Sequence, residues 1–272
     1  MNEGNPSQYR CDRCNRYFAE SELRQIRAGS GVALACPTCG DLTRKEVSRT
    51  ARPLPALLAS AFAYPFRGVT VMWTLAVLVA TTFLQFIPFV GGLLAASAEL
   101  GFLFGVLRST AAGHQELSVE AGDISDTSLW LTPLFKYIGA LVVSFGPAIG
   151  VAVALGQVGA ESGTLALVYG VAGLGLLYFP AALVVAAHAD GCLGVFNPAA
   201  GFAFIARIPG PYFLTLGFLA IAAALGGGML AAATRIEVPI VGIVARSIAS
   251  LYAPIVAMRM LGLLMEEHAE EL

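Results

Sequence analysis

The chain has 272 residues, of which 57% are apolar and only 12% are charged, and its mean hydropathy is +0.75. Soluble globular domains average about 45–50% apolar and about 25% charged residues, so this composition excludes an ordinary soluble protein. The net charge of −2 is unevenly distributed, because ten of the sixteen Lys and Arg residues lie at or before Arg67. Residues 1–8 lack the basic and apolar regions of a signal peptide, so we expect the N-terminus to stay in the cytoplasm.

Four of the five cysteines form two Cys-x-x-Cys pairs, Cys11 with Cys14 and Cys36 with Cys39. Each pair can place two thiolates on one ion, and two pairs complete a tetrahedral shell with sulfur about 2.3 Å from zinc. This pattern indicates a reducing compartment and a bound metal rather than disulfides. Because so small a domain has little core, we expect the metal to supply most of its folding free energy, about 10–16 kcal/mol.

Residues 9–45 resemble the short zinc ribbons at the N-termini of many bacterial membrane and regulatory proteins, which implies structural zinc in a cytoplasmic domain over residues 1–49. The segment from Cys36 to Gly40 also resembles a rubredoxin knuckle. Iron therefore remains an alternative, although the aromatic core and length of a rubredoxin are missing. A redox dithiol is disfavoured because two pairs imply a full shell.

A basic face on this domain raises the question of nucleic acid. It consists of Arg10, Arg13, Arg16, Arg24 and Arg27. Arginines of this kind meet phosphates, but a domain tethered beside an anionic leaflet is expected to be basic in any case. We therefore favour a lipid-facing or structural role and expect no nucleic-acid partner.

Residues 50–67 form a linker with three prolines and apolar residues at helical spacing, which predicts a short interfacial helix. Six apolar stretches follow, each long enough to span about 30 Å of hydrocarbon. The expected spans are residues 68–87, 89–107, 137–160, 162–187, 208–234 and 238–264. We therefore predict an all-α integral membrane protein with six transmembrane helices, arranged as three hairpins over residues 68–265 and preceded by the small four-cysteine zinc-ribbon domain. Residues 266–272 form an acidic tail.

The positive charges predict the orientation of these spans. With the N-terminus inside, fourteen of the sixteen basic residues lie on the cytoplasmic side, Arg235 lies outside and Arg246 lies within the membrane. The longer connections, residues 109–130 and 188–208, then also face the cytoplasm. We expect a multi-pass protein of the bacterial inner membrane with both termini in the cytoplasm.

Two apolar runs share one pattern. Pro88-Phe89-Val90-Gly91 opens a run that ends at Arg108, and Pro239-Ile240-Val241-Gly242 opens a run that ends at Arg259, with the same offset of 20 residues. We interpret the two runs as counterparts that both start at the outer face.

Glu99 is the only acidic residue inside a predicted span, and intramembrane charges are hypotheses of function by default. Arg246 differs from it in depth by about 6 Å at 1.5 Å per residue, within reach of an arginine. The favoured interpretation is a structural lock, either a Glu99–Arg246 ion pair or hydrogen bonds to nearby serines. The alternatives are a polar pathway lined by Glu99, Arg246 and Gln85, or a position of Glu99 at the membrane surface.

Other residues give weaker signals. His188 and Cys192 have metal-ligand spacing, but two ligands make a poor site, so we favour a helix terminus there. Residues 202–207 predict a short interfacial helix ending at Arg207. The familiar hydrolase, metalloprotease, P-loop and dinucleotide motifs are absent from usable contexts, so we expect no enzymatic activity.

Several motifs occur in a recognisable order. They are Ile87-Pro88, a helix ending Gly-Phe-Leu-Phe-Gly-Val-Leu-Arg108, Gly113-x-x-Glu116-Leu117, Asn197-Pro198 and Arg207-x-Pro-Gly-Pro-Tyr212. This order resembles an uncharacterised family of prokaryotic six-helix membrane proteins, a domain of unknown function that is loosely similar in layout to the Yip-type proteins. The resemblance covers about residues 60–265, departs from the family at Ser118 where a proline is expected, and implies no catalytic residues.

Together these features predict a non-enzymatic inner-membrane adaptor, assembly factor or accessory subunit whose helices anchor a zinc ribbon. The alternative is a transporter or channel-like protein with its polar site at Glu99 and Arg246. The expected partners are membrane lipid and a cytoplasmic or membrane protein, and self-association is left open.

Overall fold

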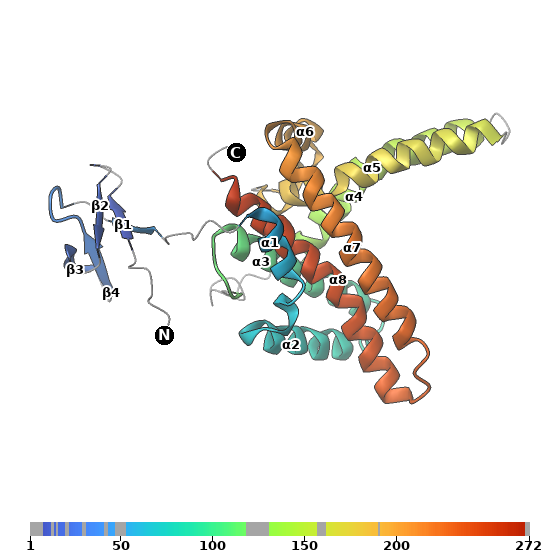
Figure 1. The fold of residues 1–272 in the computed structure, drawn as a ribbon. Helices are drawn as coiled ribbons and strands as arrows, with labels where there is room; N and C mark the ends of the chain where they lie inside the picture. The colour runs from blue at the N-terminus through green and yellow to red at the C-terminus, as the bar shows by residue number, and fades with distance from the viewer. Residues whose placement is uncertain are drawn as a thin grey trace. The chain divides into compact units, whose positions relative to one another are not determined.

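The computed structural model describes residues 8–11, 14, 16–19, 22–28, 31–40, 43–46, 53–117, 131–156, 162–189 and 191–269. The chain divides into two compact units, Met1–Pro53 and Leu54–Leu272 (Figure 1). In the described residues, the strands lie in the first unit and the helices long enough to cross a membrane lie in the second.

The first unit, called the head below, is built from short antiparallel strands. They are β1 (Gln8–Cys11), β2 (Tyr17–Ala19), β3 (Arg24–Ala28), β4 (Gly31–Ala35) and β5 (Thr43–Glu46). One sheet has the order β2-β1-β5, and β3 and β4 form a separate hairpin. Tyr9, Leu23 and Ala35 are buried beside Cys11 and Cys36, so the described core of the head is small.

The second unit, called the membrane unit below, is helical. Its elements are α1 (Leu54–Ala61), η2 (Tyr64–Phe66), α2 (Gly68–Leu84), α3 (Gly91–Ala111), α4 (Thr132–Gly156), α5 (Ser162–His188), η5 (Cys192–Phe196), α6 (Pro198–Arg207), α7 (Pro209–Ala233) and α8 (Pro239–Glu267). Among the described residues, five helices are long and apolar enough to cross a membrane, namely α3, α4, α5, α7 and α8. The prediction of a multi-pass helical membrane protein is therefore confirmed at the level of five spans.

Helix α2 corresponds to the first predicted span, residues 68–87, and it is shorter than expected. Its 17 residues end at Leu84 instead of Ile87. The residue before a proline is disfavoured in the α conformation, and Pro88 is followed by Phe89 with a φ of 65°. The reversal therefore takes up residues 85–90, which removes a turn from the predicted helix.

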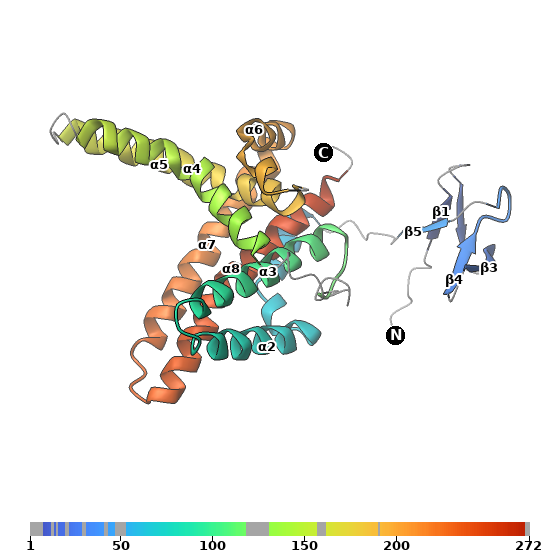
Figure 2. The same cartoon turned by 180° about the vertical axis from the view of Figure 1, so that it is seen from behind.

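The long helices form three hairpins, α2 with α3, α4 with α5 and α7 with α8 (Figures 1 and 2). The α4–α5 hairpin extends away from the others, and its inner part packs against α3, α6 and η5. The main core gathers there around residues such as Leu107, Ala181 and Ile255. A second cluster joins α1, α7 and α8 around Leu58 and Val256.

The predicted short helix of the linker forms as α1, and one of its faces is buried in the membrane unit. Leu58 is fully buried against residues of α7 and α8, among them Ala222 and Val256. The Tyr252 hydroxyl also donates a hydrogen bond to the Phe62 carbonyl just after α1, at 3.2 Å. Helix α1 is thus packed laterally on two spanning helices.

Helix α4 begins at Thr132, five residues before the predicted start at Tyr137. Proline is tolerated in the first turn of a helix, so Pro133 permits the earlier start. Lys136 then lies inside the helix, and its Nζ donates to the Ala189 carbonyl at 2.6 Å, just after α5 ends. Lys136, which was predicted to lie before the helix because of its charge, instead joins α4 to the end of α5.

Helices α3 and α8, which carry the repeated Pro-x-Val-Gly motif, pack side by side and run parallel. A Cβ added to Gly262 of α8 would collide with Thr110 and would lie 2.8 Å from the Leu107 carbonyl oxygen, so the two backbones approach closely. Gly262 follows Thr110 by 152 residues, and Pro239 follows Pro88 by 151. Residues that correspond in the sequence repeat therefore lie within one residue of each other where α3 and α8 pack together.

The glycine of the repeat has the same role in both copies. A Cβ on Gly91 would collide with the Leu84 carbonyl, and one on Gly242 would lie 2.7 Å from the Ile236 carbonyl oxygen. In each case the chain leaving the previous element crosses the first turn of the new helix. Only a residue without a side chain allows so tight a reversal.

Candidate metal centre and polar residues of the membrane unit

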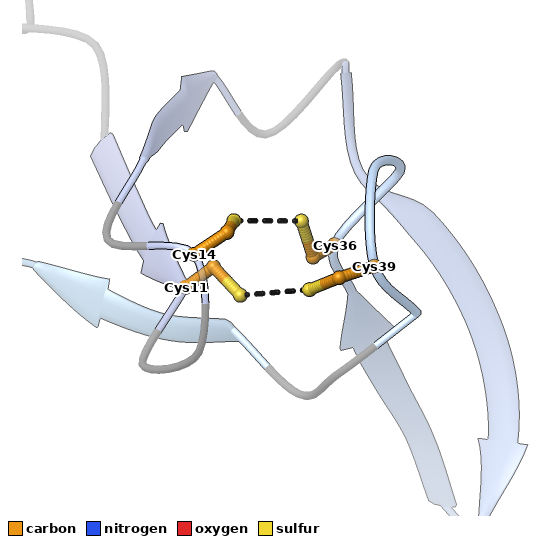
Figure 3. A group of neighbouring side chains, drawn as sticks. All are labelled: Cys11, Cys14, Cys36 and Cys39. Atoms are coloured by element: carbon orange, nitrogen blue, oxygen red, sulfur yellow. Dashed lines mark hydrogen bonds between the residues drawn. The ribbon is translucent and has the colours of Figure 1, made fainter.

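The four cysteines of the head converge from two loops (Figure 3). Cys11 ends β1 and Cys14 lies in the turn after it, whereas Cys36 follows β4 and Cys39 lies in the next turn. The Sγ atoms of Cys11 and Cys39 are 3.3 Å apart, those of Cys14 and Cys36 are 3.6 Å apart, and all four lie within 4.8 Å of one another.

Backbone hydrogen bonds close each cysteine loop. The Cys11 amide donates to the Arg16 carbonyl at 3.0 Å, and the Gly40 amide donates to the Cys36 carbonyl at 2.9 Å. Gly40 has a φ of 76°, a conformation that disfavours other residues. Each loop is thus shaped by its backbone so that two thiols face the opposite pair.

This geometry fits one tetrahedral ion. Sulfur atoms about 2.3 Å from a central zinc are separated by about 3.8 Å in a regular tetrahedron. The two measured separations lie just below this value, so small side-chain movements suffice to bind the ion. Zinc and ferrous iron both accept four thiolates, so the donor set is compatible with either metal.

The pKa values of two thiols in this set are shifted in opposite directions. Burial alone would raise the pKa of Cys36, but the backbone amides of Cys39 and Thr38 and the neighbouring thiols lower it to about 6. Burial and the hydrogen bond with Cys11 raise the pKa of Cys14. The surroundings therefore favour the thiolate form of Cys36 and disfavour that of Cys14.

The structure does not join the predicted intramembrane polar residues. Glu99 is half-buried on α3, whereas Arg246 on α8 and Gln85 at the end of α2 are exposed. Within the described residues, neither a hydrogen bond nor an ion pair links Glu99 to Arg246 or to any other side chain. The proposed ion-pair lock is therefore not formed in this structure.

The serines considered as partners of Glu99 are also not bonded to it. The hydroxyls of Ser247 and Ser250 donate to carbonyls of their own helix, at 3.0 and 2.9 Å. The Ser97 hydroxyl is buried and has no partner in the described part of the chain. Glu99 thus stands as a half-buried carboxylate in a spanning helix without a protein partner among the described residues.

Arg259 is the polar residue whose structural role the sequence did not reveal. Its Nη1 donates to the Thr110 hydroxyl and to the His114 carbonyl, both at 2.9 Å, and its guanidinium lies 4.5 Å from the centre of the Tyr64 ring. One side chain of α8 therefore connects η2, α3 and the segment after α3. The two repeated runs that end at Arg108 and Arg259 pointed to this residue in the sequence, but they did not predict which groups its side chain contacts.

Two tyrosines hold α6 and α7 against α5. The Tyr212 hydroxyl donates to the Leu177 carbonyl at 2.7 Å, in the turn before Pro180, where the proline weakens the helix's own bonds. The Tyr178 hydroxyl donates to the Pro198 carbonyl at 3.1 Å. A Cβ on Gly201 would collide with the Tyr178 ring, so α6 lies directly on it.

The remaining predicted residues lie at the ends of helices. His188 is the last residue of α5, and its Nδ1 lies 3.1 Å from the Val184 carbonyl oxygen. The side chain of Cys192 lies outside the described part of the chain, so the metal-ligand spacing of His188 and Cys192 is not tested here. The helix predicted over residues 202–207 forms as α6, with the Asn197 side chain accepting a hydrogen bond from the Ala199 amide at its start.

Comparison of the chain with family models, with curated proteins and with solved structures finds no match. The resemblances described above therefore depend on their motifs alone, and the function is argued from the geometry.

Proposed function

We propose that this protein is a non-enzymatic adaptor or accessory subunit of the bacterial inner membrane that presents a zinc ribbon to a protein partner in the cytoplasm. The observation that carries the proposal is the convergence of four cysteine sulfurs within 4.8 Å, in a unit separate from the apolar helices. Four thiolates fill the tetrahedral shell of zinc and leave no position for a substrate or a reactive water. The metal then shapes a recognition surface.

Zinc is preferred to iron because the head resembles bacterial zinc ribbons, and metal analysis tests the choice. Purified full-length protein should hold one zinc per chain. Cobalt in its place should give the spectrum of four thiolate ligands without an exchangeable position. An iron centre would be coloured and redox-active, and it would replace the adaptor proposal with electron transfer.

The proposed topology has six spans and includes α2. Seventeen residues are at the lower limit of about 17–25 for a transmembrane helix. Basic residues at the ends assigned to the cytoplasm, among them Arg108 and Lys136, support this orientation, whereas Arg235 lies at the opposite end. Six spans place both termini on one side of the membrane and five place them on opposite sides, so reporters fused to the two termini distinguish the two topologies.

Site-specific photo-crosslinking in native membranes tests the adaptor role. Arg16, Pro37 and Thr38 are exposed on the head and can be replaced one at a time by a photoreactive residue. We expect each to yield the same protein partner, and we expect Cys36→Ser to abolish the adduct at an unchanged level of membrane protein. A head that yields no reproducible adduct would contradict the proposal.

A transport pathway is the second candidate, and the half-buried, unpartnered Glu99 favours it. Burying a charge without a partner is costly, so Glu99→Gln should leave thermal stability unchanged or raise it. The pathway predicts that flux of protons or ions in proteoliposomes is lost in this variant while Arg246→Gln, at an exposed position, has a smaller effect. Equal flux in the wild-type and Glu99→Gln proteins would exclude it.

A further inference from the structure

An open groove of about 330 Å³ lies where three spanning helices end. It is lined by Arg108 and Ala111 of α3 and Ala112 just after it, by His188 of α5, and by Met265 of α8 and Ala269 just after that helix. Its walls are mostly apolar, and two of its lining side chains can donate hydrogen bonds to an anion. The groove thus combines a small apolar wall with a cationic group.

Arg108 differs from Arg259 and Lys136, two other basic side chains of the long helices. The side chains of Arg259 and Lys136 donate hydrogen bonds to protein carbonyls and to a hydroxyl. Arg108 is exposed, and in the described part of the chain its guanidinium has no hydrogen bond or ion pair. Its donors are therefore available to a ligand.

The imidazole of His188 is the second side chain of the groove that can form a hydrogen bond with a ligand. It is exposed, and its Nδ1 lies 3.1 Å from the Val184 carbonyl oxygen, which requires a proton on Nδ1 for a hydrogen bond. The other ring nitrogen, Nε2, is then available to a ligand in the groove, as an acceptor in the neutral ring and as a donor in the charged ring.

The position of the groove indicates what kind of anion reaches it. Helices α3, α5 and α8 are long enough to cross a membrane, so their ends lie at the level of the lipid headgroups on whichever side they face. The fork of a guanidinium matches the geometry of a phosphate. The C-terminal ends of helices carry partial negative charge, so Arg108 is required if an anion is to bind here.

We propose that this groove binds the phosphodiester headgroup of an anionic membrane lipid, with Arg108 on the phosphate, His188 beside it and Met265 against the glycerol. A volume of about 330 Å³ is at the lower end of the range for ligand sites, about 300–1,000 Å³, and suits a headgroup without its acyl chains. The inference depends only on the ends of the spanning helices, so it holds whether or not the head binds a partner.

The test measures the thermal stability of the full-length protein in detergent during titration with phosphatidylglycerol, phosphatidylcholine or soluble glycerol phosphate. Phosphatidylglycerol should raise the melting temperature of the wild-type protein more than phosphatidylcholine does. Arg108→Gln should weaken the phosphatidylglycerol effect about tenfold or more, which is the usual weight of a charge-assisted bond. Ala112→Glu, at an exposed groove position, should weaken it similarly by repulsion.

Arg246→Gln is the matched control, because Arg246 is also exposed on a spanning helix but does not line the groove. Its lipid response should equal that of the wild-type protein. Wild-type responses in both Arg108→Gln and Ala112→Glu would overturn the proposal. Stabilisation by glycerol phosphate at the concentrations at which phosphatidylglycerol acts would also overturn it, in favour of a soluble phosphate ligand.

Discussion

The head and the membrane unit are stabilised by different kinds of interaction. In its described residues the head buries few apolar side chains, and its two loops meet at four sulfur atoms. The membrane unit has extensive apolar clusters, but apolar burial does not hold helices together in lipid, where close packing and buried polar bonds take over. One metal ion should therefore decide whether the head folds, whereas many small contacts share the stability of the helices.

The largest expected effect is the unfolding of the head without a change in the stability of the membrane unit. Cys36→Ser removes one of four ligands, so the head should lose its metal and unfold, a loss of about 10–16 kcal/mol of binding free energy. Metal analysis and limited proteolysis of residues 1–53 would detect this loss. The melting temperature of the helices should not change, and Pro37→Ala, an exposed position between the ligands, should behave like the wild-type protein. A metal-free head that resists protease would refute the comparison.

Arg259 should be the single polar side chain with a large effect on the helices. Arg259→Gln removes charge-assisted bonds to Thr110 and to the His114 carbonyl and the contact with the Tyr64 ring. We expect a loss of about 3 kcal/mol in the free energy of unfolding, measured by denaturation in mixed micelles. Metal content should be unchanged, and a variant as stable as the wild-type protein would show that the Arg259 bonds do not hold α3 and α8 together.

Close packing should have an intermediate effect. Gly262→Ala introduces a Cβ that collides with Thr110 and presses on the Leu107 carbonyl, so the α3–α8 contact must open at a cost of about 1–3 kcal/mol. Gly227→Ala is the control, because a Cβ there meets nothing within 4 Å. The comparison of melting temperatures fails if the two variants are equally stable.

The smallest effect concerns the pH dependence of metal binding. The pKa of Cys36 is lowered to about 6, so at pH 7 this thiol is already ionised and metal binding releases no proton from it. The pKa of Cys14 is raised, so binding must displace its proton. Affinity should fall as the pH falls, and more steeply below about pH 6, where Cys36 also takes up a proton. Chelator competition between pH 5 and 8 measures the slope, and one constant slope would contradict the assignment of Cys36.

The four candidate metal ligands were predictable because their information is local. The spacing of Cys11 and Cys14, repeated at Cys36 and Cys39, specifies two loops that can each offer two thiols. The structure brings the four sulfurs together as predicted. The opposite pKa shifts of Cys36 and Cys14 were not predictable, because they depend on which backbone amides and thiols point at each sulfur.

Five of the six predicted membrane helices were also predictable in approximate position, since a span requires an apolar run of fixed length. Their ends were less predictable. Pro133 permits α4 to start early, and the reversal before Pro88 shortens α2, and both effects depend on backbone geometry at the turn.

By itself the sequence determined the class of the protein and the four candidate ligands, and its repeat predicted that α3 and α8 start on the same side, because composition, spacing and repeats carry these directly. Only the tertiary structure decided which polar groups meet. It leaves Glu99 without Arg246 in the described residues, gives Arg259 its three partners, and forms the groove at Arg108. Each of these outcomes depends on how helices distant in the chain rotate and cross, which the apolar pattern alone leaves undetermined.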